Sequence, residues 1–344
     1  MIKSISIEEY LTLDLPIPLA DVRTPAEYTQ GHIPGTFNLP IFSNEERVKV
    51  GTTYKQVGRE EAILLGFDLT GPKWSGFIKE ALMEAPHKKI AVHCWRGGMR
   101  SGAMAWALDL YGFEVLLIEG GYKSYRRWCL AQFERPYKLR ILGGMTGSGK
   151  TRILQKMAKL GDQVIDLEDL AQHQGSSFGS MNRMVQPSQE QFENDLAYQL
   201  KKLNFVQPIW VEDESLNIGK RNIPRVFFNQ MQSAPLLDLR IPLEQRIKFL
   251  VNEYGSLDKT FLEEGTLRIH KRLGPLQTKQ AIEAIWDNRM EDFIRLVLVY
   301  YDKAYLKALA KRTEANLYTL EYNSNNIEEI IVLIQQQSEA FQNI

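Results

Sequence analysis

Residues 139–151 read LRILGGMTGSGKT, and this stretch decides the architecture of the second half of the chain. Gly144–Thr151 fits the pattern G-x-x-x-x-G-K-[ST], with an apolar strand predicted at 139–142 and a helix at 151–160. In this context the pattern predicts a loop whose backbone N–H groups surround a diphosphate, with Lys150 neutralising its oxygens and Thr151 able to ligate Mg²⁺. The predicted phosphate-binding residues are Gly144, Gly147, Ser148, Gly149, Lys150 and Thr151.

Acidic residues accompany two further apolar strands of this half. Asp166 lies in the run 163–167, and Glu212, Asp213 and Glu214 directly follow the run 208–211. A metal-side acid is expected at such a strand end, so Asp166, Glu212 and Asp213 are candidates for holding a metal ion or its ligands. A solvated strand end explains any one of them equally well. The motif itself indicates a polyphosphate and not ATP in particular.

The first half contains a second anion-binding pattern, His93-Cys94-Trp95-Arg96-Gly97-Gly98-Met99-Arg100-Ser101. It follows a predicted strand at 89–93 and precedes a predicted helix at 101–111. Backbone N–H groups at a helix N-terminus attract anions and stabilise a thiolate, and Arg96 and Arg100 add positive charge. We therefore predict Cys94, Arg96 and Arg100 as catalytic residues. The spacing fits both cysteine-dependent phosphatases and rhodanese sulfurtransferases, and alone it does not separate them.

An upstream segment bears on this choice. Asp21 to Tyr28, Gly31 to Gly35 and Asn38 to Pro40 closely resemble the first signature of rhodanese domains. That resemblance places Asp21 and Arg23 near the cysteine loop, either to organise it or as an ion pair between loop and sheet.

Strand and helix signals alternate in both halves, which is typical of parallel α/β sheets. The predicted fold class is α/β, with an N-terminal rhodanese-like parallel-sheet domain followed by a P-loop NTPase-like α/β domain with a mainly helical C-terminal part. The predicted bounds are 1–133, 138–242 and 243–344, because Pro136 interrupts the preceding helix and the pattern becomes mainly helical from about Leu243.

Composition excludes several classes of protein. Of the 344 residues 44% are hydrophobic and 24% charged, as in ordinary globular proteins. No apolar run is long enough for a membrane span and Met1 to Ser6 does not read as a signal peptide, so we expect a cytoplasmic protein with no membrane partner. The two cysteines are too few for a disulfide scaffold or a structural zinc site, and Cys129 is expected to be a buried apolar residue.

Basic residues cluster although the formal net charge is zero. Between Lys123 and Arg152 there are eight basic residues and one acid, Glu134. Such a strip indicates a solvated surface or a large anionic partner. If the partner is a nucleic acid, Lys123, Arg126, Arg127 and Lys138 are the candidate contacts to its phosphates.

The combination of the two loops resembles the tRNA 2-selenouridine synthase family over nearly the whole chain. The resemblance rests on the cysteine loop, on Gly143 to Thr151, on Val164 to Glu168, on Trp210 to Ser215, on the insertion Asn44 to Arg59 and on His173 to Gly179.

This resemblance implies a reaction on 2-thiouridine at the wobble position of tRNA. The sulfur would attack C1 of geranyl diphosphate, and selenium from selenophosphate would then displace the S-geranyl group. The P-loop would hold the leaving diphosphate, while Arg96 and Arg100 would hold selenophosphate with Cys94 as nucleophile or selenium carrier. No tightly bound cofactor is expected, and Mg²⁺ is a candidate ion. Trp95, Phe178 and Trp210 are candidates for contacting the geranyl chain.

Three other interpretations stay open at this point. The first is a sulfurtransferase fused to an ATP-dependent kinase-like domain. The second is a non-catalytic, nucleotide-gated rhodanese binding module, and the third is a phosphatase.

Overall fold

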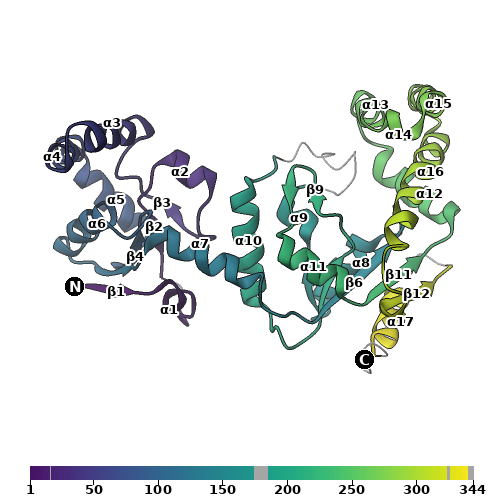
Figure 1. Ribbon diagram of the computed structural model, residues 1–344, viewed down its shortest axis with the longest axis horizontal. Helices are drawn as coiled ribbons and strands as arrows, with labels where there is room; N and C mark the ends of the chain where they lie inside the picture. The colour runs from purple at the N-terminus through teal and green to yellow at the C-terminus, as the bar shows by residue number, and fades with distance from the viewer. Residues whose placement is uncertain (16, 174–184, 324–325, 340–344) are drawn as a thin grey trace. The chain divides into compact units, whose positions relative to one another are not determined.

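The computed structural model describes residues 1–15, 17–173, 185–323 and 326–339, and the chain forms two units (Figure 1). The first unit comprises Met1–Gln132 together with Ser188–Tyr198, and the second comprises Phe133–Pro187 and Gln199–Ile344. The sequence-based bounds placed 188–198 in the P-loop domain. This segment instead packs on the first unit, because its polar side chains find their partners there.

The first unit is built on a five-stranded parallel sheet of order β1-β5-β4-β2-β3. Its central strands are buried apolar runs, as expected for a parallel sheet covered on both faces. The strands are β1 (Ile2–Ile5), β2 (Leu19–Asp21), β3 (Phe37–Asn38), β4 (Lys89–His93) and β5 (Glu114–Ile118).

Helices of the first unit begin at strong local signals. Ser6, Thr24 and Ser43 each form a capping box with a glutamate three residues later. Helices α5 and α6 pack against each other and their apolar side chains join the core above the sheet. The helices are α1 (Ile7–Leu11), α2 (Pro25–Gln30), α3 (Asn44–Gln56), α4 (Arg59–Thr70), α5 (Trp74–Glu84), α6 (Met99–Leu110) and α7 (Gly121–Gln132).

The second unit contains another five-stranded parallel sheet, of order β12-β11-β6-β8-β7. The strand that leads into the phosphate loop, β6, lies at its centre. The strands are β6 (Leu139–Gly144), β7 (Gln163–Ile165), β8 (Ile209–Glu212), β11 (Leu236–Arg240) and β12 (Leu317–Glu321), and a short hairpin adds β9 (Asn217–Ile218) and β10 (Arg221–Asn222).

Two hydrophobic clusters organise the helices of the second unit. Helices α8 and α17 pack together over β6, β8 and β11, whereas the helices from α12 to α16 share a core of their own. The helices are α8 (Lys150–Lys159), α9 (Leu167–Ala171), α11 (Arg225–Ser233), α12 (Leu243–Tyr254), α13 (Lys259–Arg268), α14 (His270–Leu273), α15 (Pro275–Trp286), α16 (Met290–Leu309) and α17 (Ile327–Glu339). Helix α10 (Gln189–Lys202) belongs to the first unit over residues 189–198 and to the second unit only in its last turn.

The predicted fold class is confirmed. Both halves are parallel α/β sheets, and a helical part follows the second, although β12 returns from it to the sheet edge. Among the described residues, no helix combines the length and the apolar character that a membrane span requires.

Candidate active site

The cysteine loop lies where β4 ends and α6 begins. Gly98 N–H donates to Cys94 Sγ at 3.3 Å, and the Ser101 hydroxyl donates to the same sulfur at 3.2 Å. The loop needs glycine at position 97, where φ is +67° and a Cβ would lie 2.9 Å from the carbonyl oxygen of Ile118. The chain therefore curls around the sulfur and aims hydrogen-bond donors at it.

These donors stabilise the thiolate of Cys94. Burial raises the pKa of the thiol, but hydrogen bonds from Ser101 and from the backbone at Arg96, together with the charge of Arg100, outweigh burial and lower it. Cys129 Sγ accepts a hydrogen bond from the Arg126 guanidinium at 3.3 Å, but burial outweighs this cation and raises the pKa of the thiol to about 12. Cys129 is buried, as the sequence predicted, whereas the lowered pKa of Cys94 suits a nucleophile and its catalytic role stays a prediction.

The two arginines of the loop differ in their surroundings. Arg100 makes a two-pronged ion pair with Glu27, with distances of 2.7 and 3.2 Å. Arg96 is exposed. The exposed guanidinium of Arg96 can donate hydrogen bonds to an incoming anion directly. Arg100 is fixed by its ion pair with Glu27 and contributes positive charge from there.

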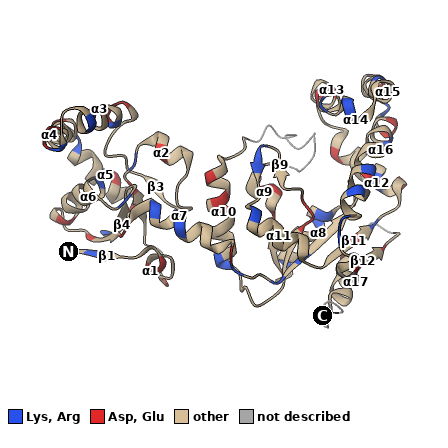
Figure 2. Cartoon of the chain, viewed as in Figure 1, with Lys and Arg blue, Asp and Glu red and all other residues tan. Residues whose placement is uncertain are grey.

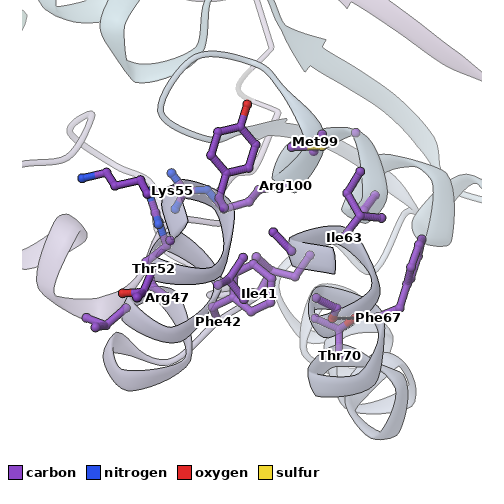
Figure 3. A pocket seen from close by; sticks show the side chains of 18 of the residues that line it. Ile41, Phe42, Arg47, Thr52, Lys55, Ile63, Phe67, Thr70, Met99 and Arg100 are labelled. Atoms are coloured by element: carbon purple, nitrogen blue, oxygen red, sulfur yellow. Dashed lines mark hydrogen bonds between the residues drawn. The ribbon is translucent and has the colours of Figure 1, made fainter. Parts of the chain in front are cut away.

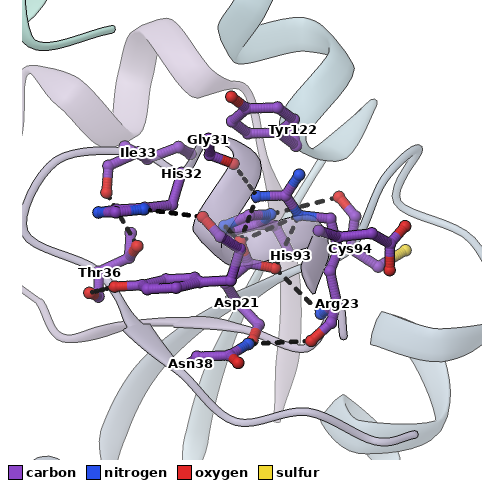
Figure 4. A network of polar contacts seen from close by, with 12 residues as sticks. Asp21, Arg23, Gly31, His32, Ile33, Thr36, Asn38, His93, Cys94 and Tyr122 are labelled. Atoms are coloured by element: carbon purple, nitrogen blue, oxygen red, sulfur yellow. Dashed lines mark hydrogen bonds and ion pairs between the residues drawn. The ribbon is translucent and has the colours of Figure 1, made fainter. Parts of the chain in front are cut away.

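A buried polar network supports the loop from behind (Figure 4). Asp21 and Arg23 form a fully buried ion pair, and Arg23 also donates to the carbonyl oxygen of Gly31 at 2.7 Å. The Arg23 guanidinium lies 3.7 Å from the ring centroid of Tyr122, and His93 Nε2 lies 3.7 Å from Asp21. Burial lowers the pKa of His93. Asp21 and Arg23 therefore lie near the cysteine loop, as the resemblance implied. Their ion pair joins two residues at the end of β2, and the Arg23 guanidinium also lies 5.8 Å from the ring centroid of Trp95 in the cysteine loop.

The phosphate loop connects β6 to α8 in the second unit. Gly147 has φ +84°, and a Cβ there would lie 2.9 Å from Leu250, so only glycine fits. Lys150 Nζ donates to the Gly144 carbonyl at 2.9 Å. The buried Ser148 hydroxyl has no hydrogen-bond partner among the described residues. A helix N-terminus, a lysine and an unpartnered hydroxyl together suit an anion.

Helices of the C-terminal part hold this loop in place. The buried Arg246 on α12 donates to the Thr146 carbonyl at 3.1 Å and pairs with Asp302 on α16 at 2.7 Å. Nearby, Tyr305 on α16 donates to Asp238 in the middle of β11 at 2.6 Å. The helical part therefore fixes the shape of the phosphate loop.

Three glutamates gather beside the loop. Glu168, Glu212 and Glu214 bring carboxylate oxygens within 4.8 Å of one another, and Thr151 donates to Glu212 at 2.9 Å. Burial and the neighbouring Glu212 raise the pKa of both Glu168 and Glu214. Burial lowers the pKa of Lys150, but these carboxylates outweigh it and raise that pKa. Such a concentration of negative charge suits a divalent cation.

The predicted acids are divided by the structure. Glu212 belongs to this cluster. Asp213 instead pairs with Arg312 at 2.7 Å, and Asp166 accepts the Asp169 N–H as the N-cap of α9. Glu214, which the sequence placed with Glu212 at the same strand end, also belongs to the cluster, whereas Glu168, just beyond another predicted strand, was not considered for this role. The sequence feature that could have grouped these acids is that each follows a strand of a parallel sheet, because the carboxyl ends of such strands lie at the same edge.

Both halves of the chain match families of known proteins. A family model described as tRNA 2-selenouridine synthase AAA domain matches residues 137–264, and a rhodanese-like domain model matches residues 8–127. The tRNA 2-selenouridine synthase of Shewanella frigidimarina is 36% identical over 342 residues, which cover 88% of this chain and 91% of that protein. This chain belongs to the tRNA 2-selenouridine synthase family.

Two further members of the tRNA 2-selenouridine synthase family show the same relation. The protein from Nitrosomonas europaea is 41% identical over 250 residues, or 69% of this chain and 63% of that protein. The protein from Shewanella sediminis is 36% identical over 336 residues, or 86% of this chain and 88% of that protein. The similarity thus extends across both units.

The basic strip of this tRNA 2-selenouridine synthase family member is only partly available to a partner. Arg126 on α7 pairs with Glu193 and donates to Asn194 at 2.6 Å, both on the segment of α10 that belongs to the first unit. Figure 2 shows basic residues on α7 and acidic residues on α10. Lys123, Arg127 and Lys138 are exposed. Arg126 is therefore a structural residue, while the other three remain candidates for phosphate contacts.

The aromatic candidates for contacting the geranyl chain differ in their exposure. Trp95 is 39% exposed beside the cysteine loop, whereas Trp210 is 2% exposed in the core of the second unit. Phe178 lies outside the described residues, as does most of the segment from His173 to Gly179. Of the described candidates only Trp95 can contact a ligand.

Proposed function

We propose that this chain converts 2-thiouridine in tRNA to 2-selenouridine by way of an S-geranyl intermediate. The observation that carries this proposal is the presence, in one member of this family, of a thiolate-stabilising cysteine loop and a separate diphosphate-binding loop. Each loop suits one of two successive transfers, and neither alone would replace sulfur by selenium.

The first step is assigned to the phosphate loop. The sulfur of 2-thiouridine attacks C1 of geranyl diphosphate, a C–S bond forms, the C–O bond breaks and diphosphate leaves. Lys150 and the N–H groups at the start of α8 stabilise the charge that develops on the leaving group. The Ser148 hydroxyl, buried without a partner among the described residues, supplies a further donor.

The carboxylate cluster fits a magnesium ion. Three buried or half-buried glutamates concentrate negative charge around Lys150, and the Thr151 hydroxyl faces the same place. Glu168, Glu212, Glu214 and Thr151 would hold the ion directly or through water. When bound, Mg²⁺ would neutralise charge on the diphosphate.

The second step is assigned to the cysteine loop. The Cys94 thiolate attacks the phosphorus of selenophosphate, so that an S–P bond forms and the P–Se bond releases selenide. Selenide then attacks C2 of the S-geranyl base, the C–S bond breaks, and geranylthiol leaves after gaining a proton. Water hydrolyses the phosphocysteine and returns the thiol. Arg96, with the charge of Arg100 behind it, suits the phosphate of this step.

Mass spectrometry of tRNA nucleosides tests this proposal. We expect purified protein with geranyl diphosphate alone to form S-geranyl-2-thiouridine, and with selenophosphate added as well to form 2-selenouridine. Selenophosphate alone should form neither. Selenium incorporation without geranyl diphosphate, or a requirement for ATP, would favour the sulfurtransferase–kinase alternative.

A further inference from the structure

A large cavity opens in the first unit between the helix pair α3 and α4 and helix α6 (Figure 3). Its volume is about 820 Å³, within the range of roughly 300–1,000 Å³ that small-molecule sites occupy. Helices α3 and α4, which pack against each other, form much of its wall. Both helices also pack on the core of the first unit, through Val50 of α3 and Leu69 of α4.

The lining is mainly apolar and has one basic side. Ile63 and Phe67 lie on one side in Figure 3, and Arg47 and Lys55 lie on the other. Phe67 is 60% exposed and Met99 is 56% exposed, so apolar side chains face water at this site. A group of exposed apolar residues in a hollow marks a binding site for an apolar group. The basic side suits anionic groups attached to it.

The cavity adjoins the cysteine loop through the first turn of α6. Met99 and Arg100 line the cavity, and the preceding residue, Gly98, donates its N–H to Cys94 Sγ. Gly102, one helical turn after Gly98, also lines it. A ligand in the cavity would therefore lie next to the group that performs the second step.

We propose that this cavity holds the apolar chain of the S-geranyl base during the selenium step. The inference rests on the proposed function, which supplies the chain, while the cavity itself selects an apolar group linked to an anionic polymer. Arg47 and Lys55 would face the tRNA phosphates. When the C2–S bond breaks, geranylthiol separates from the base, and its hydrocarbon part is still in the cavity at that moment.

Filling the cavity tests this assignment. A side chain at Gly102 would project into open space, since a Cβ there meets no atom within 4 Å, and the same holds for Gly76 on α5 outside the cavity. Gly102→Leu and Gly76→Leu are therefore matched helical substitutions. Gly102→Ala adds one carbon and provides a graded, mild variant.

The measurement is the affinity for two RNA stem-loops without selenophosphate, one carrying S-geranyl-2-thiouridine and one S-methyl-2-thiouridine. We expect wild-type protein and Gly76→Leu to prefer the geranyl RNA by about tenfold or more, because burial of several carbons favours binding. Gly102→Leu should reduce the preference to about twofold or less, with Gly102→Ala between them. Equal affinities in wild-type protein, or an unchanged preference in Gly102→Leu, would overturn the inference.

A parallel titration with free geranyl diphosphate separates the two steps. If Gly102→Leu weakens only this ligand and leaves the geranyl RNA unaffected, the cavity serves the first step and the present assignment is wrong. Because these are binding measurements, they stand even if no selenouridine forms. Failure of the proposed function would instead appear as absent turnover with the chain preference intact.

Discussion

Cys94 owes its reactivity to a few neighbouring atoms. Its sulfur is buried, which by itself favours the neutral thiol, yet the Ser101 hydroxyl and two backbone donors reverse that preference. A hydrogen bond to a charged group contributes about 1.5–3 kcal/mol. One serine can therefore decide how much thiolate exists at neutral pH.

The pH dependence of alkylation tests this role of Ser101. Because the thiolate is the reacting form and its pKa is lowered, iodoacetamide should label Cys94 with an inflection below the ordinary value of about 8.5. Ser101→Ala should move the inflection upward by about 1–2 pH units. Cys129 is the internal control and should stay unlabelled at these pH values, since burial raises its pKa to about 12. An identical profile in Ser101→Ala would show that this hydroxyl does not stabilise the thiolate.

Residues within compact motifs could be predicted, and residues brought together by folding could not. The predicted positions of Cys94 and Lys150 follow from short patterns whose backbone geometry is local. Glu168 joins Glu212 only because β7 and β8 are neighbours in a parallel sheet. Arg126 looked like a free surface cation because its partner, Glu193, is distant in sequence.

At the scale of elements, α10 determines which basic residues of the strip are exposed. The part of α10 in the first unit covers one side of α7, with Tyr122 donating to Glu190 and Asn194 donating to Tyr122. The ion pair between Arg126 and Glu193 is mostly buried. Only the exposed basic residues of α7, Lys123 and Arg127, remain to contact an anionic partner.

Salt titration of tRNA binding separates these two kinds of basic residue. Lys123→Ala combined with Arg127→Ala should weaken all tRNAs similarly and lower the slope of log affinity against log salt by roughly 1.4–1.8, since fewer counterions are released. Arg126→Ala should leave the slope unchanged and lower the melting temperature, because Glu193 loses its ion-pair partner and Asn194 loses a hydrogen bond. If the double variant binds with the wild-type slope, α7 is not a tRNA surface.

Strand prediction succeeded where a strand is a continuous buried run. The runs predicted at 89–93 and 139–142 became β4 and β6. Five strands were missed, namely the two short hairpin strands β9 and β10 and three strands of the main sheets. β1 is mostly exposed, Asp238 interrupts the apolar run of β11, and β12 is a half-exposed edge strand within a helical region. Each of them depends on a neighbouring strand more than on its own sequence pattern.

At the scale of the whole molecule, the two units have chemically different sites. The first unit contains a cysteine with a lowered pKa, an exposed arginine and an apolar cavity. The second contains a phosphate loop and a carboxylate cluster. The proposed reaction needs both kinds of site in sequence, and it predicts that each step can be blocked separately.

The most direct test is nucleoside mass spectrometry of two variants, Cys94→Ala and Lys150→Ala, with both substrates present. Cys94→Ala should retain geranylation, lose selenium incorporation and accumulate S-geranyl-2-thiouridine. Lys150→Ala should slow geranylation by about 10²-fold or more, the effect of removing one donor from a developing anion, yet convert supplied S-geranyl tRNA to 2-selenouridine. Normal selenation by Cys94→Ala, or loss of both steps in each folded variant, would contradict this division of the reaction.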